Sequence, residues 1–115
     1  MPVVIYHNPR CSKSRQTLEL LNDRGLEPEI VEYLASPPSA ATLKDILSKL
    51  GLEARQLMRR GEERYKELNL DAPELSEEAL IQAMVENPIL IERPIVLTSG
   101  KAALGRPPEN VLNIL

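Results

Sequence analysis

The chain has 115 residues, of which 43% are hydrophobic and 27% charged, and its formal net charge is −3. This length fits one domain with a core that needs neither disulfides nor a structural metal, so we expect a single domain over residues 1–115. The acidic balance argues against a nucleic-acid partner, which calls for a basic surface and aromatic rings on which bases stack. The chain has no Phe or Trp and only three Tyr.

The first residues form an apolar run that ends at His7, too short for a signal peptide or a membrane-spanning helix. We therefore expect no membrane partner. Cys11 is the only cysteine. A single cysteine without an export signal indicates a reducing compartment, so we expect a cytoplasmic protein. One His and one Cys are too few ligands for a metal site, and none is predicted.

The N-terminal third predicts a strand, a helix and a second strand. Residues 3–6 form a β-branched run of strand length. From Ser12 the apolar spacing becomes helical, and Gly25 supplies a stop signal. Residues 28–33 alternate like another strand. Two parallel strands joined by a helix form a βαβ unit.

The middle of the chain predicts a helical insertion at about residues 39–87. Ser39 is a candidate N-cap, and apolar residues follow at i, i+3, i+4, i+7 spacing. Shorter helical segments are expected from Ala54 to about Gly61 and over residues 65–70. A longer helix opens at Ser76 and stops before Pro88.

The C-terminal third predicts a hairpin and a last short helix. Residues 95–98 and 101–104 read as strands joined by the two-residue turn Ser99-Gly100. Prolines at 107 and 108 open the helix. The predicted order is β-α-β, helices, β-β-α. This is the order of an α/β chain with a thioredoxin-like fold, a helical insertion and a mixed four-stranded sheet.

Cys11 is the candidate reactive group. An isolated cysteine is commonly a small buried apolar residue. Here the thiol lies where a strand gives way to a helix N-terminus, with Arg10, Lys13 and Arg15 nearby. The helix dipole and these cations favour the thiolate, which is the reactive form. Free N–H groups at the same terminus can hold an oxyanion bonded to the sulfur. We therefore predict a nucleophilic Cys11.

Ser14 occupies the position of the second cysteine in a Cys-x-x-Cys pair. A dithiol resolves its own mixed disulfide, whereas Cys11 depends on glutathione or on a partner protein such as glutaredoxin. The Ser14 hydroxyl can donate to the thiolate or belong to an ordinary first helical turn. His7, the only histidine, has two interpretations. It is either a structural hydrogen-bonding residue or a group that assists thiolate formation or orients the loop.

We expect most of the arginines on solvated, salt-bridged faces. Two arginines differ from these. Arg93 and Arg106 each precede a proline, which restricts the backbone and suits fixed placement of a side chain. An ordinary surface role is the alternative for both. Pro94 is a candidate cis proline, because a thioredoxin-like fold has one opposite its active cysteine.

Several motifs together carry a family resemblance over essentially the whole chain. They are His7–Arg15, Arg59, Glu92–Val96 and Gly105–Glu109, with the central stretches Arg55–Arg60 and Tyr65–Leu68. In this order and spacing they resemble the glutaredoxin-linked arsenate reductases of bacteria, an ArsC-like family with a thioredoxin-like fold. The resemblance implies a catalytic Cys11 with His7 near the thiol. It also implies an oxyanion pocket of Arg59, Arg93 and Arg106, with Ser14, Arg15 and Pro94 in support.

The function that follows is reduction of arsenate to arsenite for detoxification. Cys11 attacks arsenic, glutathione is the co-substrate, glutaredoxin resolves the mixed disulfide, and no cofactor is tightly bound. One alternative is a glutathione-dependent thiol oxidoreductase with another substrate. Another is a regulator that binds RNA polymerase, like the related Spx proteins, but the missing second cysteine and the intact arginine set argue against it. Lys13 departs from the family pattern by adding a cation beside the thiol.

Overall fold

The computed structural model describes residues 2–115, which divide into two compact units. Unit 1 contains the chain through Ser36 together with Arg93–Leu115, and unit 2 contains Pro37–Glu92. The single domain expected over residues 1–115 stays a prediction. Within residues 2–115, no helix has both the length and the apolar character needed to cross a bilayer.

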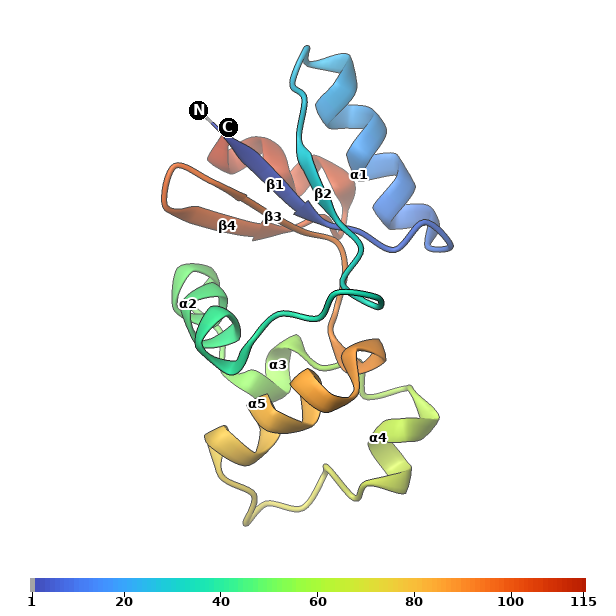
Figure 1. Cartoon of the computed structure of the whole chain (residues 1–115), viewed down its shortest axis with the longest axis vertical. Helices are drawn as coiled ribbons and strands as arrows, with labels where there is room; N and C mark the ends of the chain where they lie inside the picture. The colour runs from blue at the N-terminus through green and yellow to red at the C-terminus, as the bar shows by residue number, and fades with distance from the viewer. Residues whose placement is uncertain (1) are drawn as a thin grey trace. The chain divides into compact units, whose positions relative to one another are not determined.

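Unit 1 is a mixed four-stranded sheet with helices, as predicted (Figure 1). Its elements are β1 (Val3–Tyr6), α1 (Ser12–Asp23), β2 (Glu29–Val31), β3 (Ile95–Thr98), β4 (Lys101–Leu104) and the 3-10 helix η2 (Pro108–Ile114). The strand order is β2-β1-β3-β4. Strands β1 and β2 run parallel, whereas β3 is antiparallel to both β1 and β4. Both parallel strands therefore end at the same edge of the sheet.

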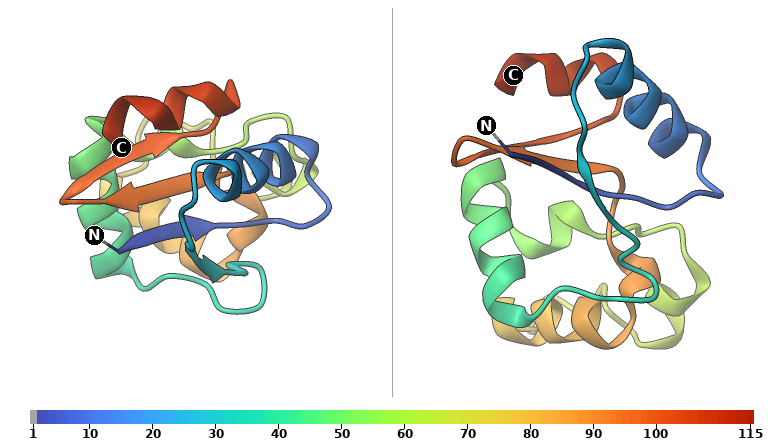
Figure 2. Two further views of the ribbon diagram at one scale, coloured as in Figure 1. Left: turned by 90° about the horizontal axis from the view of Figure 1, so that it is seen from above. Right: turned by 45° about the horizontal axis from the view of Figure 1, so that its top comes forward.

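Helices α1 and η2 lie side by side on one face of this sheet (Figure 2). They cover an aliphatic core, since the chain has no Phe or Trp. Its buried members are Val3, Ile5, Leu21, Val96, Ala103 and Val111. Burying such side chains away from water supplies the main driving force for folding this unit.

The β3–β4 hairpin has the predicted two-residue turn. Ser99 and Gly100 have φ values of 54° and 76°. Positive φ at both central positions is the signature of the turn that matches the twist of hairpin strands, and Gly adopts it without strain. Thr98 therefore pairs with Lys101 across the turn.

The second strand is shorter than the predicted residues 28–33. Only Glu29–Val31 pair in the sheet, because a turn begins at Glu32. The carbonyl of Glu32 accepts hydrogen bonds from the N–H groups of Ala35 and Ser36 at 3.0 and 2.9 Å. This turn carries the chain away from the end of β2.

Unit 2 is helical, and its two long helices begin where predicted. It contains α2 (Ala40–Leu50), α3 (Ala54–Leu57), α4 (Glu63–Glu67), α5 (Glu77–Glu86) and the 3-10 helix η1 (Pro88–Leu90). The side chains of Ser39 and Ser76 accept hydrogen bonds from the N–H groups of Thr42 and Ala79, both at 3.1 Å. These bonds satisfy donors that a helix start leaves free.

The two short helices of unit 2 differ from the prediction. Helix α3 ends at Leu57 and does not reach Gly61, because Met58 forms an antiparallel bridge with Ile91. Helix α4 begins at Glu63 and ends before Asn69, which has a φ of 54°. The spacing of apolar residues does not predict these two helix ends. A bridge to a distant residue ends α3, and a residue in the left-handed conformation follows the end of α4.

Gly105 makes a close approach that ties three parts of unit 1 together. Its N–H donates to the carbonyl of Pro94 at 3.0 Å. A Cβ atom here would meet Oγ1 of Thr17, and would lie 2.7 Å from Cγ of Pro94. Only glycine lets the end of β4 pack this closely against α1 and the residue before β3.

Gly105→Ala should therefore lower the free energy of unfolding by about 1–3 kcal/mol, the usual cost of overpacking. Urea denaturation monitored by circular dichroism measures the change. Gly61→Ala is the matched control, because nothing lies within 4 Å of the added carbon and its φ is not positive. Equal stabilities of the two variants would contradict the assignment of Gly105 as a close-packing position.

Candidate active site

Cys11 lies at the N-cap of α1, at the end of the loop that follows β1. Its backbone is extended, with φ −94° and ψ 124°, and the residue is 9% exposed. Asn8 holds the loop in shape: its carbonyl accepts from the N–H of Cys11 and its Oδ1 from the N–H of Arg10, both at 3.0 Å. This role of Asn8 was not predicted from the sequence, although Asn-Pro is a turn signal.

The environment of Cys11 lowers the pKa of its thiol. Burial acts in the opposite direction and raises the pKa, whereas the backbone N–H of Ser14 and the charge of Arg93 lower it. The N–H of Lys13 and a hydrogen bond from the Arg93 side chain add to the lowering. The thiolate is thus stabilised by peptide dipoles and one guanidinium, as expected for a reactive cysteine at a helix start.

His7 and Ser14 form a buried pair beside this loop. Nδ1 of His7 lies 2.6 Å from Oγ of Ser14, which also accepts the N–H of Asn8 at 3.0 Å. Burial lowers the pKa of His7, the charge of Glu32 raises it and that of Arg15 lowers it, with a net decrease. A neutral imidazole therefore faces the hydroxyl at neutral pH.

The side chain and the backbone of Ser14 have different roles in this arrangement. Its hydroxyl bonds to His7 and Asn8, whereas its backbone N–H stabilises the Cys11 thiolate. His7 therefore contacts Ser14, and its role beside the thiol stays a prediction. The relation is not visible in the sequence, because residues 7 and 14 meet across a loop and not at helical spacing.

Three further predicted residues belong to unit 1. Nη1 of Arg106 donates to the carbonyl of Arg93 at 3.1 Å, and Nη1 of Arg15 donates to the carbonyl of Pro9 at 2.8 Å. The Arg93–Pro94 peptide bond is cis, as is the bond after Arg106. Unit 1 thus contains Cys11 and every predicted site residue except Arg59.

Arg59 belongs to unit 2. Its Nη1 pairs with Oε1 of Glu62 at 2.7 Å and lies 3.5 Å from the carbonyl of Ile89. Its backbone N–H donates to the carbonyl of Leu90 at 2.7 Å. These bonds fix the backbone and side chain of Arg59, and its place in the oxyanion pocket stays a prediction.

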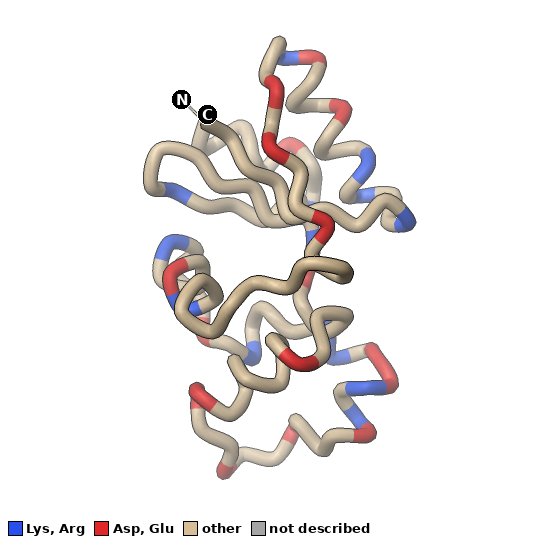
Figure 3. The backbone as a smooth tube through the Cα atoms, viewed as in Figure 1, with Lys and Arg blue, Asp and Glu red and all other residues tan. Residues whose placement is uncertain are grey.

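Charged side chains follow different parts of unit 1. Lys and Arg gather in the loop before α1 and in its first turns, whereas Asp and Glu follow the segment around β2 (Figure 3). The cationic group includes Arg10, Lys13 and Arg15, and the acidic group includes Glu29 and Glu32. An anion is therefore favoured at the Cys11 loop.

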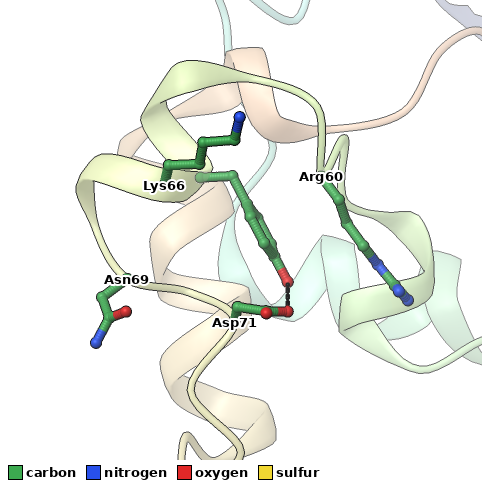
Figure 4. A pocket seen from close by; sticks show the side chains of 5 residues that line it. Arg60, Lys66, Asn69 and Asp71 are labelled. Carbon is green, nitrogen blue, oxygen red and sulfur yellow. Dashed lines mark hydrogen bonds between the residues drawn. The ribbon is translucent and has the colours of Figure 1, made fainter.

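Unit 2 has a hollow of about 370 Å³ that none of the predicted site residues lines (Figure 4). Among the residues that line this hollow, the hydroxyl of Tyr65 donates to Oδ1 of Asp71 at 3.3 Å. The side chains of Lys66 and Asn69 point away from Asp71, so the polar groups do not converge on one ligand. Among residues 2–115, no group of three or more His, Cys, Asp or Glu is placed to hold a metal ion.

Comparisons with known proteins agree with one another. Residues 6–114 match the ArsC family. The chain is 65% identical to the uncharacterized protein YfgD of Escherichia coli K12, over 98% of this chain and 96% of that one. It is 55% identical to an arsenate reductase of Neisseria meningitidis serogroup A, over the full length of both. The solved arsenate reductase from Vibrio cholerae is 57% identical and superimposes with a TM-score of 0.98, covering 100% of this chain and 98% of that one.

Arg93→Gln should raise the pKa of the Cys11 thiol, because it removes both a nearby positive charge and a hydrogen bond to the sulfur. The pH dependence of alkylation by iodoacetamide measures this pKa. The rate is constant above the pKa and falls about tenfold per pH unit below it, since only the thiolate reacts. The variant's profile should therefore shift to higher pH.

Arg24→Gln is the control, because it removes one charge from unit 1 at a position that does not affect the thiol. Its profile should coincide with that of the unchanged chain. Coincident profiles for all three proteins would show that Arg93 does not stabilise the thiolate.

Proposed function

This chain belongs to the ArsC family, and from that premise we propose that it is an enzyme that reduces arsenate to arsenite with Cys11 as the nucleophile. The observation that carries the proposal is the lowered pKa of a single thiol at a helix N-terminus beside Arg93. The arsenate reductases among its relatives match the chain over its full length.

The first step is binding of the oxyanion at the Cys11 loop. Arg93 and Arg106 are linked by a hydrogen bond, and guanidinium groups match the oxygens of a tetrahedral anion with two parallel donors. Backbone N–H groups at the start of α1 add further donors. We include Arg59 in this set because of the family motif, as a prediction for mutagenesis.

The second step forms a bond between Sγ of Cys11 and arsenic. The thiolate supplies the electron pair, and one arsenic oxygen leaves as water after taking up protons, so arsenic remains pentavalent. The lowered pKa of the thiol increases the fraction of Cys11 that is present as the thiolate nucleophile. Arginine donors offset the charge that builds up on the remaining oxygens.

The third step is the reduction. The thiolate of glutathione bonds to Sγ of Cys11 while the sulfur–arsenic bond breaks and its electron pair stays on arsenic, which leaves as trivalent arsenite. Cys11 is then held in a mixed disulfide with glutathione. Because Ser14 replaces the second cysteine of a redox pair, an external thiol such as that of glutaredoxin must release Cys11.

The test is arsenate-dependent NADPH oxidation with glutathione, glutaredoxin and glutathione reductase. We expect turnover with the unchanged chain and background rates with Cys11→Ser, which removes the nucleophile. Circular dichroism of the variant controls for folding. Absence of arsenate-dependent turnover, or turnover that survives Cys11→Ser, would refute the proposal. Reduction of a glutathionylated substrate with arsenate inert would instead favour a thiol oxidoreductase.

A further inference from the structure

Unit 1 contains a hollow of about 390 Å³ beside the Cys11 loop. One wall is the loop after β1, with His7, Pro9 and Arg10. The other wall is the turn after β2, with Glu32, Leu34 and Ala35. The two walls are joined by a hydrogen bond of 2.9 Å from the N–H of His7 to the carbonyl of Val31.

The position of this hollow is typical of a ligand site. It lies beyond the carboxyl ends of the parallel strands β1 and β2. In open α/β sheets, ligands bind at that edge, in the crevice formed by the loops that follow the strands. The loop that lines the hollow with Arg10 leads directly into Cys11, so one loop connects the hollow and the thiol-bearing residue.

The hollow presents one positive and one negative side chain. Among the residues that the structure describes, the Arg10 guanidinium and the Glu32 carboxylate take part in no salt bridge or hydrogen bond, and both are exposed. Leu34 is 43% exposed, which is high for a leucine. Free opposite charges flanking an apolar surface match a ligand with a zwitterionic end and a short aliphatic arm.

We propose that this hollow binds the α-amino-acid head group of a low-molecular-weight thiol that attacks Cys11. The guanidinium of Arg10 takes the carboxylate, the carboxylate of Glu32 takes the ammonium, and Leu34 packs against the methylene groups. Glutathione fits, because its γ-glutamyl end carries both charges. This inference rests on the proposed function for the identity of the thiol, and we call the hollow the thiol subsite.

The dimensions agree with this assignment. A γ-glutamyl arm resembles two residues of extended chain and spans about 7 Å. Arg10 and Cys11 are consecutive, so their Cα atoms are about 3.8 Å apart. A head group held between Arg10 and Glu32 therefore leaves the thiol of the same molecule within reach of Sγ of Cys11.

The test uses the full chain with Cys11 in a mixed disulfide with thionitrobenzoate. An added thiolate bonds to Sγ of Cys11, the original sulfur–sulfur bond breaks, and thionitrobenzoate leaves with its electron pair and is read by absorbance. Two thiols are compared at equal thiolate concentration: glutathione, and N-acetylcysteinylglycine, in which an acetyl group replaces the γ-glutamyl group and the cysteine nitrogen stays an amide, so the two thiolates have similar intrinsic nucleophilicity. We expect glutathione to react about tenfold faster, which corresponds to about 1.4 kcal/mol.

Arg10→Gln and Glu32→Gln should each bring the ratio of the two rates toward one, because each slows glutathione more than N-acetylcysteinylglycine. Arg24→Gln and Glu29→Gln are matched controls, because both residues are exposed and neither lines the thiol subsite. These controls should keep the ratio of the unchanged chain.

Two results would overturn the inference: a ratio near one in the unchanged chain, or a ratio that neither Arg10→Gln nor Glu32→Gln lowers. The assay contains no arsenate, so its outcome is separate from that of the proposed function. Loss of the thiol subsite with intact arsenate turnover would leave the proposed function standing, and the reverse result would refute the function while keeping the subsite.

Discussion

The stabilisation of negative charge on Sγ of Cys11 is the interaction on which the rest of the site depends. Burial opposes this charge, while the N–H of Ser14 and the guanidinium of Arg93 favour it. The two stabilising groups come from distant parts of the sequence. The first requires that α1 begin directly after Cys11, and the second requires that the start of β3 be held near that helix.

The fold meets both requirements with short-range packing in unit 1. Asn8 closes the loop between β1 and α1, so the sulfur meets the helix amides. Gly105 brings β4 against Thr17 of α1 and against Pro94, the neighbour of Arg93. The position of Arg93 thus follows from a contact in which neither Arg93 nor Cys11 takes part.

Cys11 is the only cysteine of the chain, and this bears on the external thiol that the proposed reaction needs. A second cysteine at position 14 would provide an internal resolving thiol. Instead, the hydroxyl of Ser14 bonds to His7 and its backbone supports the thiolate. The position has therefore taken a structural task in place of a redox task. In the proposed reaction an external thiol must therefore release Cys11, and the proposed thiol subsite binds that thiol.

Sequence patterns predict the parts of the molecule that local rules determine. The start of α1 after Cys11, the N-caps Ser39 and Ser76, and the turn at Ser99 all follow from short-range chemistry. The order of elements then gives the fold class. The predicted end of α3 was wrong, because the bridge between Met58 and Ile91 is a tertiary contact that the spacing of apolar residues does not reveal.

Part of the candidate site could also be predicted from sequence patterns. Cys11 stands out by its position before a helix, and Arg93 by the proline that follows it. The His7–Ser14 pair and the close approach at Gly105 depend on side chains that meet only in the folded chain. Arg59 came from the family motif alone, since periodicity does not separate it from Arg60.

In the proposed reaction the Cys11 thiolate bonds directly to arsenic. The most direct measurement is the electron density of crystals soaked in arsenate. We expect a covalent bond between Sγ and arsenic, with the Arg93 guanidinium donating to an arsenic oxygen. Arsenate bound away from a free Cys11 thiol would contradict it.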